Sequence, residues 1–245
     1  MTIRLLSALA VVGACAFSAS SQTILSSGHV DLGILYESGG WDLHVHKEIP
    51  SPEEEFAPSE AILRLGAKSQ LAGGVPNSQA ATAFFGPAGS PLWILPKSED
   101  PDLPFLGIGT EEMSSVDWNG SLSLTLTDVR GPGDVFVWDV GAFGELQPKM
   151  SSRDGFSAGD SLNIEAGGHA HYFWAFSAPG DYEVFVFAKG DHKADGPVQS
   201  EPAGYRFQVV PEPGTGVLTV AGLVLLGWRR RASWRRESPV VGGSR

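Results

Sequence analysis

The chain has 245 residues and a formal net charge of −11, so its surface repels nucleic acid and anionic lipid and tends to concentrate cations. We therefore expect no nucleic-acid partner. Cys15 is the only cysteine, and it lies in a segment that we expect to be removed. A disulfide, a cysteine nucleophile and an iron–sulfur cluster are thus excluded, and any metal site must be built from His, Asp and Glu.

Residues 1–21 are typical of a secretory signal peptide. Arg4 precedes an apolar run, residues 5–17, and small residues follow it. We expect signal peptidase to cleave before Gln22, although Val12-Gly13-Ala14-Cys15 is close to a lipoprotein box and leaves lipidation as an alternative. The remaining body, residues 22–210, has ten Lys and Arg against 26 Asp and Glu, a net charge of −16. Its length is sufficient for one hydrophobic core without stapling.

Short strands and turns account for nearly all of this body. Residues 121–127 alternate between apolar and polar side chains, as a half-buried strand does, and no sustained helical pattern occurs outside the two ends. We predict an all-β fold in which residues 22–210 form a single antiparallel β-sandwich or jelly-roll-like domain, flanked by the signal peptide and a short C-terminal transmembrane sorting helix. The clearest predicted strands are 30–36, 41–46, 61–65, 122–129, 134–140, 171–176, 182–188 and 205–210.

Glycine, proline and acidic residues mark the connections between these strands. Asn119-Gly120 is a type I′ turn signal, and we expect a hairpin there. Loops are predicted where such residues dominate over longer stretches, because connecting segments are usually polar and lie on the surface. The predicted loops are 50–58, 72–91, 96–104 and 190–204.

Five of the six histidines fall in suggestive positions. Asp42, His44 and His46 are two residues apart, so on a strand they share one face, with neighbouring Cβ atoms roughly 6.5–7 Å apart. His169 and His171 form a second pair with the same spacing, and His29 is a further candidate ligand.

Two imidazoles on a rigid strand can occupy adjacent positions of a metal ion, and a second pair from a distant strand can complete the shell. We therefore predict a divalent metal site drawn from His29, Asp42, His44, His46, His169 and His171. Zinc is the leading candidate because the ligands are imidazoles without thiolates; copper, nickel and manganese stay open. Six ligands exceed the needs of a tetrahedral ion, so some are expected to orient the others or take no part.

Two other functions remain open from the residues alone. The histidines of a structural or adhesive matrix protein would simply pack, and exposed tryptophans could stack on a surface polysaccharide. A metal-dependent hydrolase would need an open coordination position and a general base such as Glu48. The chain has no HExxH or Gly-x-Ser-x-Gly motif, so the enzyme is the less favoured function, and we assign no catalytic residue.

The last 35 residues, 211–245, have three consecutive parts. Pro211, Glu212 and Pro213 come first, followed by an apolar run at 214–228. A basic cluster then begins, with Arg229, Arg230 and Arg231 at its start. A helix of fifteen residues spans only about 22 Å, short of a bilayer core of about 30 Å, so length alone would leave a permanent span doubtful.

The order of the three parts resembles the PEP-CTERM sorting signal. That resemblance implies recognition by an exosortase-type enzyme, with the membrane holding the chain until it is cut near the motif. The arginines would anchor the span on the cytoplasmic side. An ordinary tail anchor is the alternative.

The body is similar to the choice-of-anchor M domain, a group related to the actinobacterial surface-anchored protein domain. The similarity extends over residues 28–190 and is carried by the segments 28–33, 39–46, 93–96, 105–107, 131–138, 168–176 and 178–182. It implies an exported, surface-attached protein without an established activity. Together with the tail, it implies a location in the envelope, surface or extracellular matrix of a Gram-negative-type bacterium.

Overall fold

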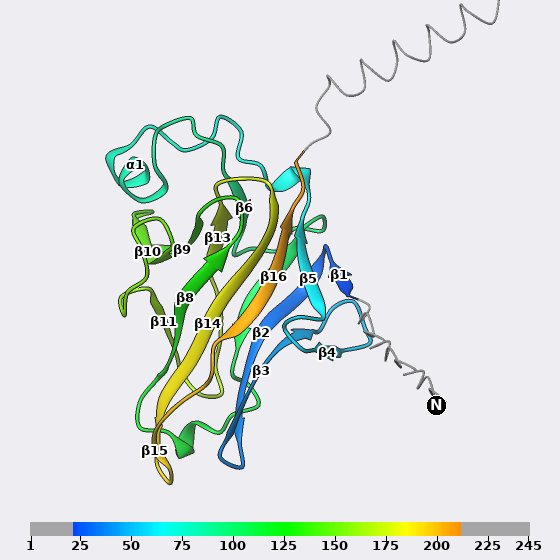
Figure 1. Ribbon diagram of the computed structural model, residues 1–245, viewed down its shortest axis with the longest axis vertical. Helices are drawn as coiled ribbons and strands as arrows, with labels where there is room; N and C mark the ends of the chain where they lie inside the picture. The colour runs from blue at the N-terminus through cyan, green and yellow to red at the C-terminus, as the bar shows by residue number, and fades with distance from the viewer. Residues whose placement is uncertain (1–21, 212–245) are drawn as a thin grey trace, which may run out of the picture.

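The computed structural model describes residues 22–211, and nearly all of its regular structure is β-strand (Figure 1). The signal peptide predicted at 1–21 lies outside this range. So do Glu212, Pro213, the apolar run at 214–228 and the arginines Arg229, Arg230 and Arg231. Among the described residues, no helix has the length and apolar character needed to cross a membrane.

A seven-stranded sheet crosses the front of the molecule in Figure 1. Its order is β1-β5-β16-β14-β8-β11, with β15 paired to β14. The pairs β1–β5 and β5–β16 are parallel and the others antiparallel. The bounds are β1 (Thr23–Leu25), β5 (Ala61–Leu65), β8 (Leu122–Arg130), β11 (Ser161–Ile164), β14 (Gly180–His192), β15 (Gly196–Gln199) and β16 (Ala203–Val209).

Two further sheets complete the fold. The four-stranded sheet has the order β10-β9-β13-β6, and the five-stranded sheet has the order β12-β7-β2-β3-β4, in which β2 and β7 are parallel. The strands of the first are β6 (Trp93–Leu95), β9 (Val135–Val140), β10 (Leu146–Ser151) and β13 (Phe173–Phe176). Those of the second are β2 (Gly28–Glu37), β3 (Gly40–Lys47), β4 (Glu54–Phe56), β7 (Pro104–Gly109) and β12 (His169–His171).

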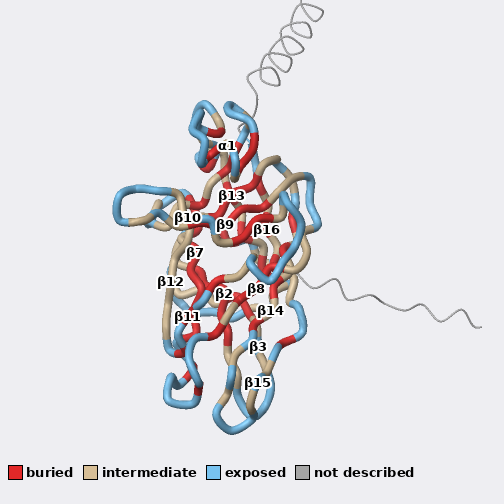
Figure 2. The backbone as a smooth tube through the Cα atoms, turned by 90° about the vertical axis from the view of Figure 1, so that its left-hand side faces the viewer, coloured by how far each residue is buried: buried red, intermediate tan, exposed pale blue. Residues whose placement is uncertain are grey.

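The main hydrophobic core joins all three sheets, as expected for a sandwich. Along β14 the inward positions Tyr182, Val184, Val186 and Ala188 alternate with more exposed ones, which is the period of a strand with one buried face. A smaller apolar cluster packs around Phe136 under the helix α1 (Gln79–Phe85). Figure 2 shows buried backbone through the middle of the molecule and exposed loops at its ends.

The all-β prediction is confirmed, but two of the three sheets within residues 22–211 are mixed, and only the four-stranded sheet is purely antiparallel as expected. The predicted strand at 61–65 coincides with β5, and most other predicted strands lie inside longer observed ones. The predicted strand 171–176 is divided at Tyr172 into β12 and β13, which belong to different sheets.

Several short elements were not predicted. The loop expected at 72–91 contains α1. Ser78 caps the N-terminus of this helix, because its side-chain oxygen accepts a hydrogen bond from the Ala81 amide. The loops at 50–58 and 190–204 contain β4 and β15. Short 3₁₀ turns occupy Ala67–Ser69 and Ser115–Asp117.

The hairpin expected at Asn119-Gly120 is wrong. Gly120 does have a positive φ of 86°, as a turn requires. Strand β8, however, follows the 3₁₀ turn Ser115–Asp117 and pairs with β14 and β11, not with a strand directly preceding it.

Candidate metal centre

The five-stranded sheet has two different faces because its strands alternate with a period of two. On β2, Val30 and Ile34 point into the core, and His29 and Asp31 are on the opposite, outer face. The register places Asp31 beside His46 of β3 and beside Gly107 of β7. The outer face therefore carries polar side chains from β2, β3 and β12, and β7, which lies between β12 and β2, contributes Gly107 and Gly109.

Glycines on this face make room for the polar groups. A Cβ atom built on Gly107 would lie 2.0 Å from Asp31 Oδ1 and 2.4 Å from His169 Nε2. A Cβ built on Gly33 would lie 2.2 Å from His44 Nε2. The close approach of the ring nitrogens and the carboxylate thus requires glycine at both positions.

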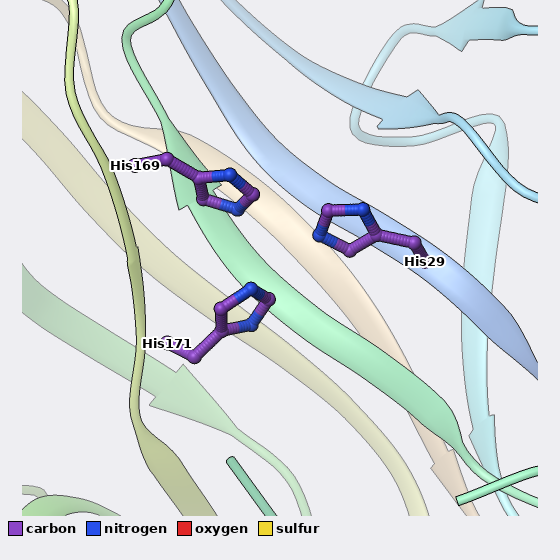
Figure 3. Close-up of side chains that lie close together, drawn as sticks. All are labelled: His29, His169 and His171. Atoms are coloured by element: carbon purple, nitrogen blue, oxygen red, sulfur yellow. The ribbon is translucent and has the colours of Figure 1, made fainter. Parts of the chain in front are cut away.

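Three histidines meet above β7. His29 projects from β2, and His169 and His171 project from β12 on the other side of β7, with the rings directed toward one another (Figure 3). Each can offer one ring nitrogen such that the three atoms lie within 4.8 Å of one another. Phe105 of β7 stacks on His171 with the ring centroids 3.7 Å apart, which fixes the plane of that imidazole.

The Nδ1 atom of each histidine already faces an acceptor. His171 Nδ1 donates to the Leu106 carbonyl oxygen at 3.0 Å, His29 Nδ1 lies 2.6 Å from Glu48 Oε2, and His169 Nδ1 lies 3.1 Å from Glu111 Oε1. An acceptor at Nδ1 selects the tautomer that leaves the Nε2 lone pair free, and this is how histidine ligands are commonly oriented. The Nε2 atoms are therefore the ones left for a ligand, and that of His169 lies 2.9 Å from Asp31 Oδ1.

Asp31 lies beside these nitrogens and is only 1% exposed. Its Oδ1 is 2.9 Å from His169 Nε2 and 3.4 Å from His29 Nε2, whereas Oδ2 and His29 Nε2 have no hydrogen-bond partner. Burial raises the pKa of the Asp31 carboxyl above its ordinary value, against the opposing effect of His29 and His169. A buried carboxylate with an unpartnered oxygen is costly unless a positive charge accompanies it.

The imidazole of His171 is suited to bind a cation as well. Burial lowers the pKa of His171 below its ordinary value, despite the hydrogen bond to Leu106. The ring is therefore neutral at pH 7, which is the state in which imidazole acts as a metal ligand.

The six residues predicted as ligands separate into two groups. His29, His169 and His171 lie together, whereas His44 lies near Glu55 and Glu112. The residues of the β3 series are not equivalent: His44 is buried, His46 is half-buried, and the Asp42 side chain is 65% exposed with its carboxylate 3.9 Å from His44 Nδ1. Asp42 is thus at the margin of the second group.

The sequence analysis did not select Asp31, Glu111 or Glu112. Asp31 carried a usable signal, because it lies on the predicted strand 30–36 two residues after His29, so the two share a face once the strand extends back to His29, as β2 does. Glu111 and Glu112 carried none, since only the fold brings the segment after β7 to the histidines. Glu48 was considered as a general base, and it instead holds His29 Nδ1.

The C-terminal end of the described chain leads into the sorting tail. Strand β16 ends at Val209, and the Val210 amide donates to the Leu65 carbonyl oxygen at 2.9 Å. The family model described as the PEP-CTERM protein-sorting motif matches residues 209–236. The chain carries a PEP-CTERM sorting signal.

The PEP-CTERM signal implies export, a membrane-held intermediate, recognition by an exosortase-type enzyme and sorting to the surface. The β-sheet domain described above is what this signal delivers. No curated protein and no solved structure matches the chain.

Proposed function

We propose that this PEP-CTERM protein holds a divalent metal ion, with zinc as the leading candidate, at the cell surface. The ligands are His29, Asp31, His169 and His171. One observation carries the proposal: three imidazoles whose Nδ1 atoms face acceptors lie together, and the Nε2 atoms of His29 and His169 lie 3.4 and 2.9 Å from the buried carboxylate of Asp31.

The spacing of the donor atoms suits a small ion. Zinc bonds of about 2.0–2.1 Å in a tetrahedron place donor atoms about 3.3 Å apart. The distances from Asp31 Oδ1 to His169 Nε2 and His29 Nε2, 2.9 and 3.4 Å, lie on either side of that value. His169 Nε2 and Asp31 Oδ1 are 2.9 Å apart, the distance of a hydrogen bond, so a metal bound to both atoms would displace the proton that they share.

The ligand set favours a held metal over a hydrolytic one. Three histidines and one aspartate fill a tetrahedral shell, whereas a catalytic zinc keeps one position for water. The carboxylates of Glu48 and Glu111 face the Nδ1 atoms of His29 and His169, where they orient ligands rather than act as a general base. We therefore favour a metal that is carried as cargo or that serves as a structural ion linking β2 and β12.

The location is proposed from the sorting signal and from the similarity to the choice-of-anchor M domain. A Gram-negative-type envelope, surface or extracellular matrix fits both. The acidic body favours the capture of cations from outside the cell. A structural or adhesive matrix role that does not involve metal is the competing function.

Elemental analysis of the full chain, purified in mild detergent without a histidine tag, tests the proposal. After chelation and reloading with zinc, the wild type should retain zinc through dialysis against metal-free buffer. A metal present at 100 times its Kd adds about 2.7 kcal/mol, which for a chain of this size raises the Tm by about 5–10 °C.

The variants His171→Ala and His192→Ala provide the comparison. His192 lies on β14, where it contacts Asp195 and Trp118, outside the proposed centre. We expect His171→Ala to lose the tightly held zinc and the zinc-dependent rise in Tm, and His192→Ala to keep both. The proposal is overturned if the wild type retains no zinc, copper, nickel or manganese, or if His171→Ala binds as tightly as the wild type.

A further inference from the structure

A small cavity lies next to the proposed centre on the same outer face of the five-stranded sheet. Its volume is about 80 Å³, and its polar lining comes from Asp31, His44, His46, Glu111 and Glu112. Asp31 and Glu111 thus line this cavity while their carboxylates also contact His169 of the first centre. The lining contains three carboxylates, an excess of negative charge for so small a volume.

His44 is the unexplained residue of this cavity. Only 5% of the residue is exposed, and neither of its ring nitrogens has a hydrogen-bond partner. Its nearest charged neighbours, Asp42 Oδ2 and Glu112 Oε1, are each 3.9 Å away, beyond hydrogen-bond range. A buried imidazole without a partner costs free energy, so a ligand for one of these nitrogens would remove that cost.

The surroundings of His44 supply such a ligand set. His44, Glu55 and Glu112 can each offer one donor atom such that all three lie within 4.8 Å of one another. The ring lies directly over Gly33, where a Cβ atom would meet Nε2 at 2.2 Å. Nitrogen and carboxylate donors in this number suit zinc or manganese.

Asp31 links the two sets of residues. Its Oδ1 faces His29 and His169, whereas Oδ2 is buried without a partner. A carboxylate with one oxygen directed at each of two cations is a common arrangement in two-metal sites. The orphaned Oδ2 is explained if a cation occupies the neighbouring cavity.

We propose that a second divalent cation binds to His44, Glu55 and Glu112, and that Asp31 bridges it to the first metal. The bridging part rests on the proposed function, whereas the second site has its own ligands. The centre is then binuclear, with the first cation held mainly by imidazole and the second mainly by carboxylate. The second site is the weaker one, because two of its ligands, Glu55 and Glu112, are exposed.

Zinc titration of the metal-free full chain in detergent, followed by calorimetry, tests this inference. The wild type should bind two zinc ions per chain with different affinities. Gly33→Ala places a methyl group against His44 Nε2 and should abolish only the weaker step. Gly40→Ala is the matched control, since Gly40 lies on β3 of the same sheet but outside the cavity, and its Cβ would be 3.6 Å from the nearest atom, the Glu37 carbonyl oxygen.

His44→Ala provides a second, independent variant and should likewise reduce the stoichiometry to one. Retention of the tight step in Gly33→Ala and His44→Ala would show that both variants are folded. His171→Ala should lose the tight step and retain the weak one.

The outcomes separate the two proposals. A wild type that binds one zinc, lost in His171→Ala and kept in His44→Ala, overturns the second site and leaves the first intact. A single zinc lost in His44→Ala and kept in His171→Ala overturns the first site and supports the second. Two zinc ions that persist in His44→Ala and Gly33→Ala overturn the second site, and a wild type that binds no zinc or manganese overturns both.

Discussion

The inner face of the five-stranded sheet carries Val30, Leu32 and Ile34 on β2, and the outer face carries His29, Asp31 and Gly33 on the same strand. Val30, Leu32 and Ile34 are at most 2% exposed, and Asp31 is 1% exposed. Both faces therefore exclude water at the middle of the strand. The inner face does so by apolar packing, whereas the outer face buries ionisable groups, which is stable only with compensating partners. Adjacent residues of β2 are thus stabilised in different ways, by apolar packing on the inner face and by charged or hydrogen-bonding partners on the outer face.

The largest effect is expected from the inner face. Leu32→Ala removes a buried side chain from the main core and should lower the free energy of unfolding by about 3 kcal/mol. Chemical denaturation with and without zinc measures it. The loss should be the same in both conditions, and a loss that vanishes with zinc would contradict the separation of the two faces.

Substitutions on the outer face should change the affinity for zinc more than the free energy of unfolding. Gly107→Ala places a methyl group between Asp31 Oδ1 and His169 Nε2, so we expect zinc affinity to fall by about 100-fold, within the range seen when ligand geometry is disturbed. Isothermal titration of Gly107→Ala beside Gly40→Ala, whose Cβ would be near only the Glu37 carbonyl oxygen, measures the difference. Equal affinities in the two variants would count against the centre.

Tyr182 is a buried polar group that does have a partner, which sharpens the contrast with Asp31. Its hydroxyl donates to the Ala178 carbonyl oxygen at 2.7 Å, and burial raises the pKa of Tyr182 to about 12. Tyr182→Phe should cost about 1 kcal/mol at pH 7 through the lost hydrogen bond.

The pH dependence of the same variant gives a second measurement. Because the folded pKa of Tyr182 exceeds its ordinary value of 10.0, the stability from the protonated form is complete below pH 10 and declines as pH rises toward 12. The wild type should lose up to about 2–3 kcal/mol relative to Tyr182→Phe over that window. Parallel unfolding curves for the two proteins between pH 9 and 11.5 would show that this tyrosine titrates normally.

The sequence predicted most of the long strands because their apolar residues alternate clearly, as in β5 and β14. It did not predict β7, since Gly107 and Gly109 lower the strand propensity of 104–109. Gly107 is also the residue that gives the Asp31 carboxylate and the His169 imidazole room above β7. The glycine that weakens the strand pattern of 104–109 is therefore the same residue that makes room for the site.

The histidine pairs indicated a metal site, and the structure brings three of the six predicted ligands together. The pairing of β12 with β7 is what joins His169 and His171 to His29. The pairings of β7 with β12 and with β2 cannot be derived from spacing along the chain. The contacts of Glu48 and Glu111 cannot be derived in this way either. The distinction between His44 and the exposed Asp42 also depends on which segments cover the outer face.

The exit of the chain toward its sorting signal has a mechanical consequence. Strand β16 is paired on one side with β5 over Arg206–Val209 and on the other with β14 over its whole length. A pull directed along the axis of β16 would load both ladders in shear, so their hydrogen bonds would have to break together instead of one at a time. Resistance to such forced unfolding is set by the unfolding rate. A protein tethered through this strand would withstand drag at the cell surface better than one tethered through a terminal edge strand.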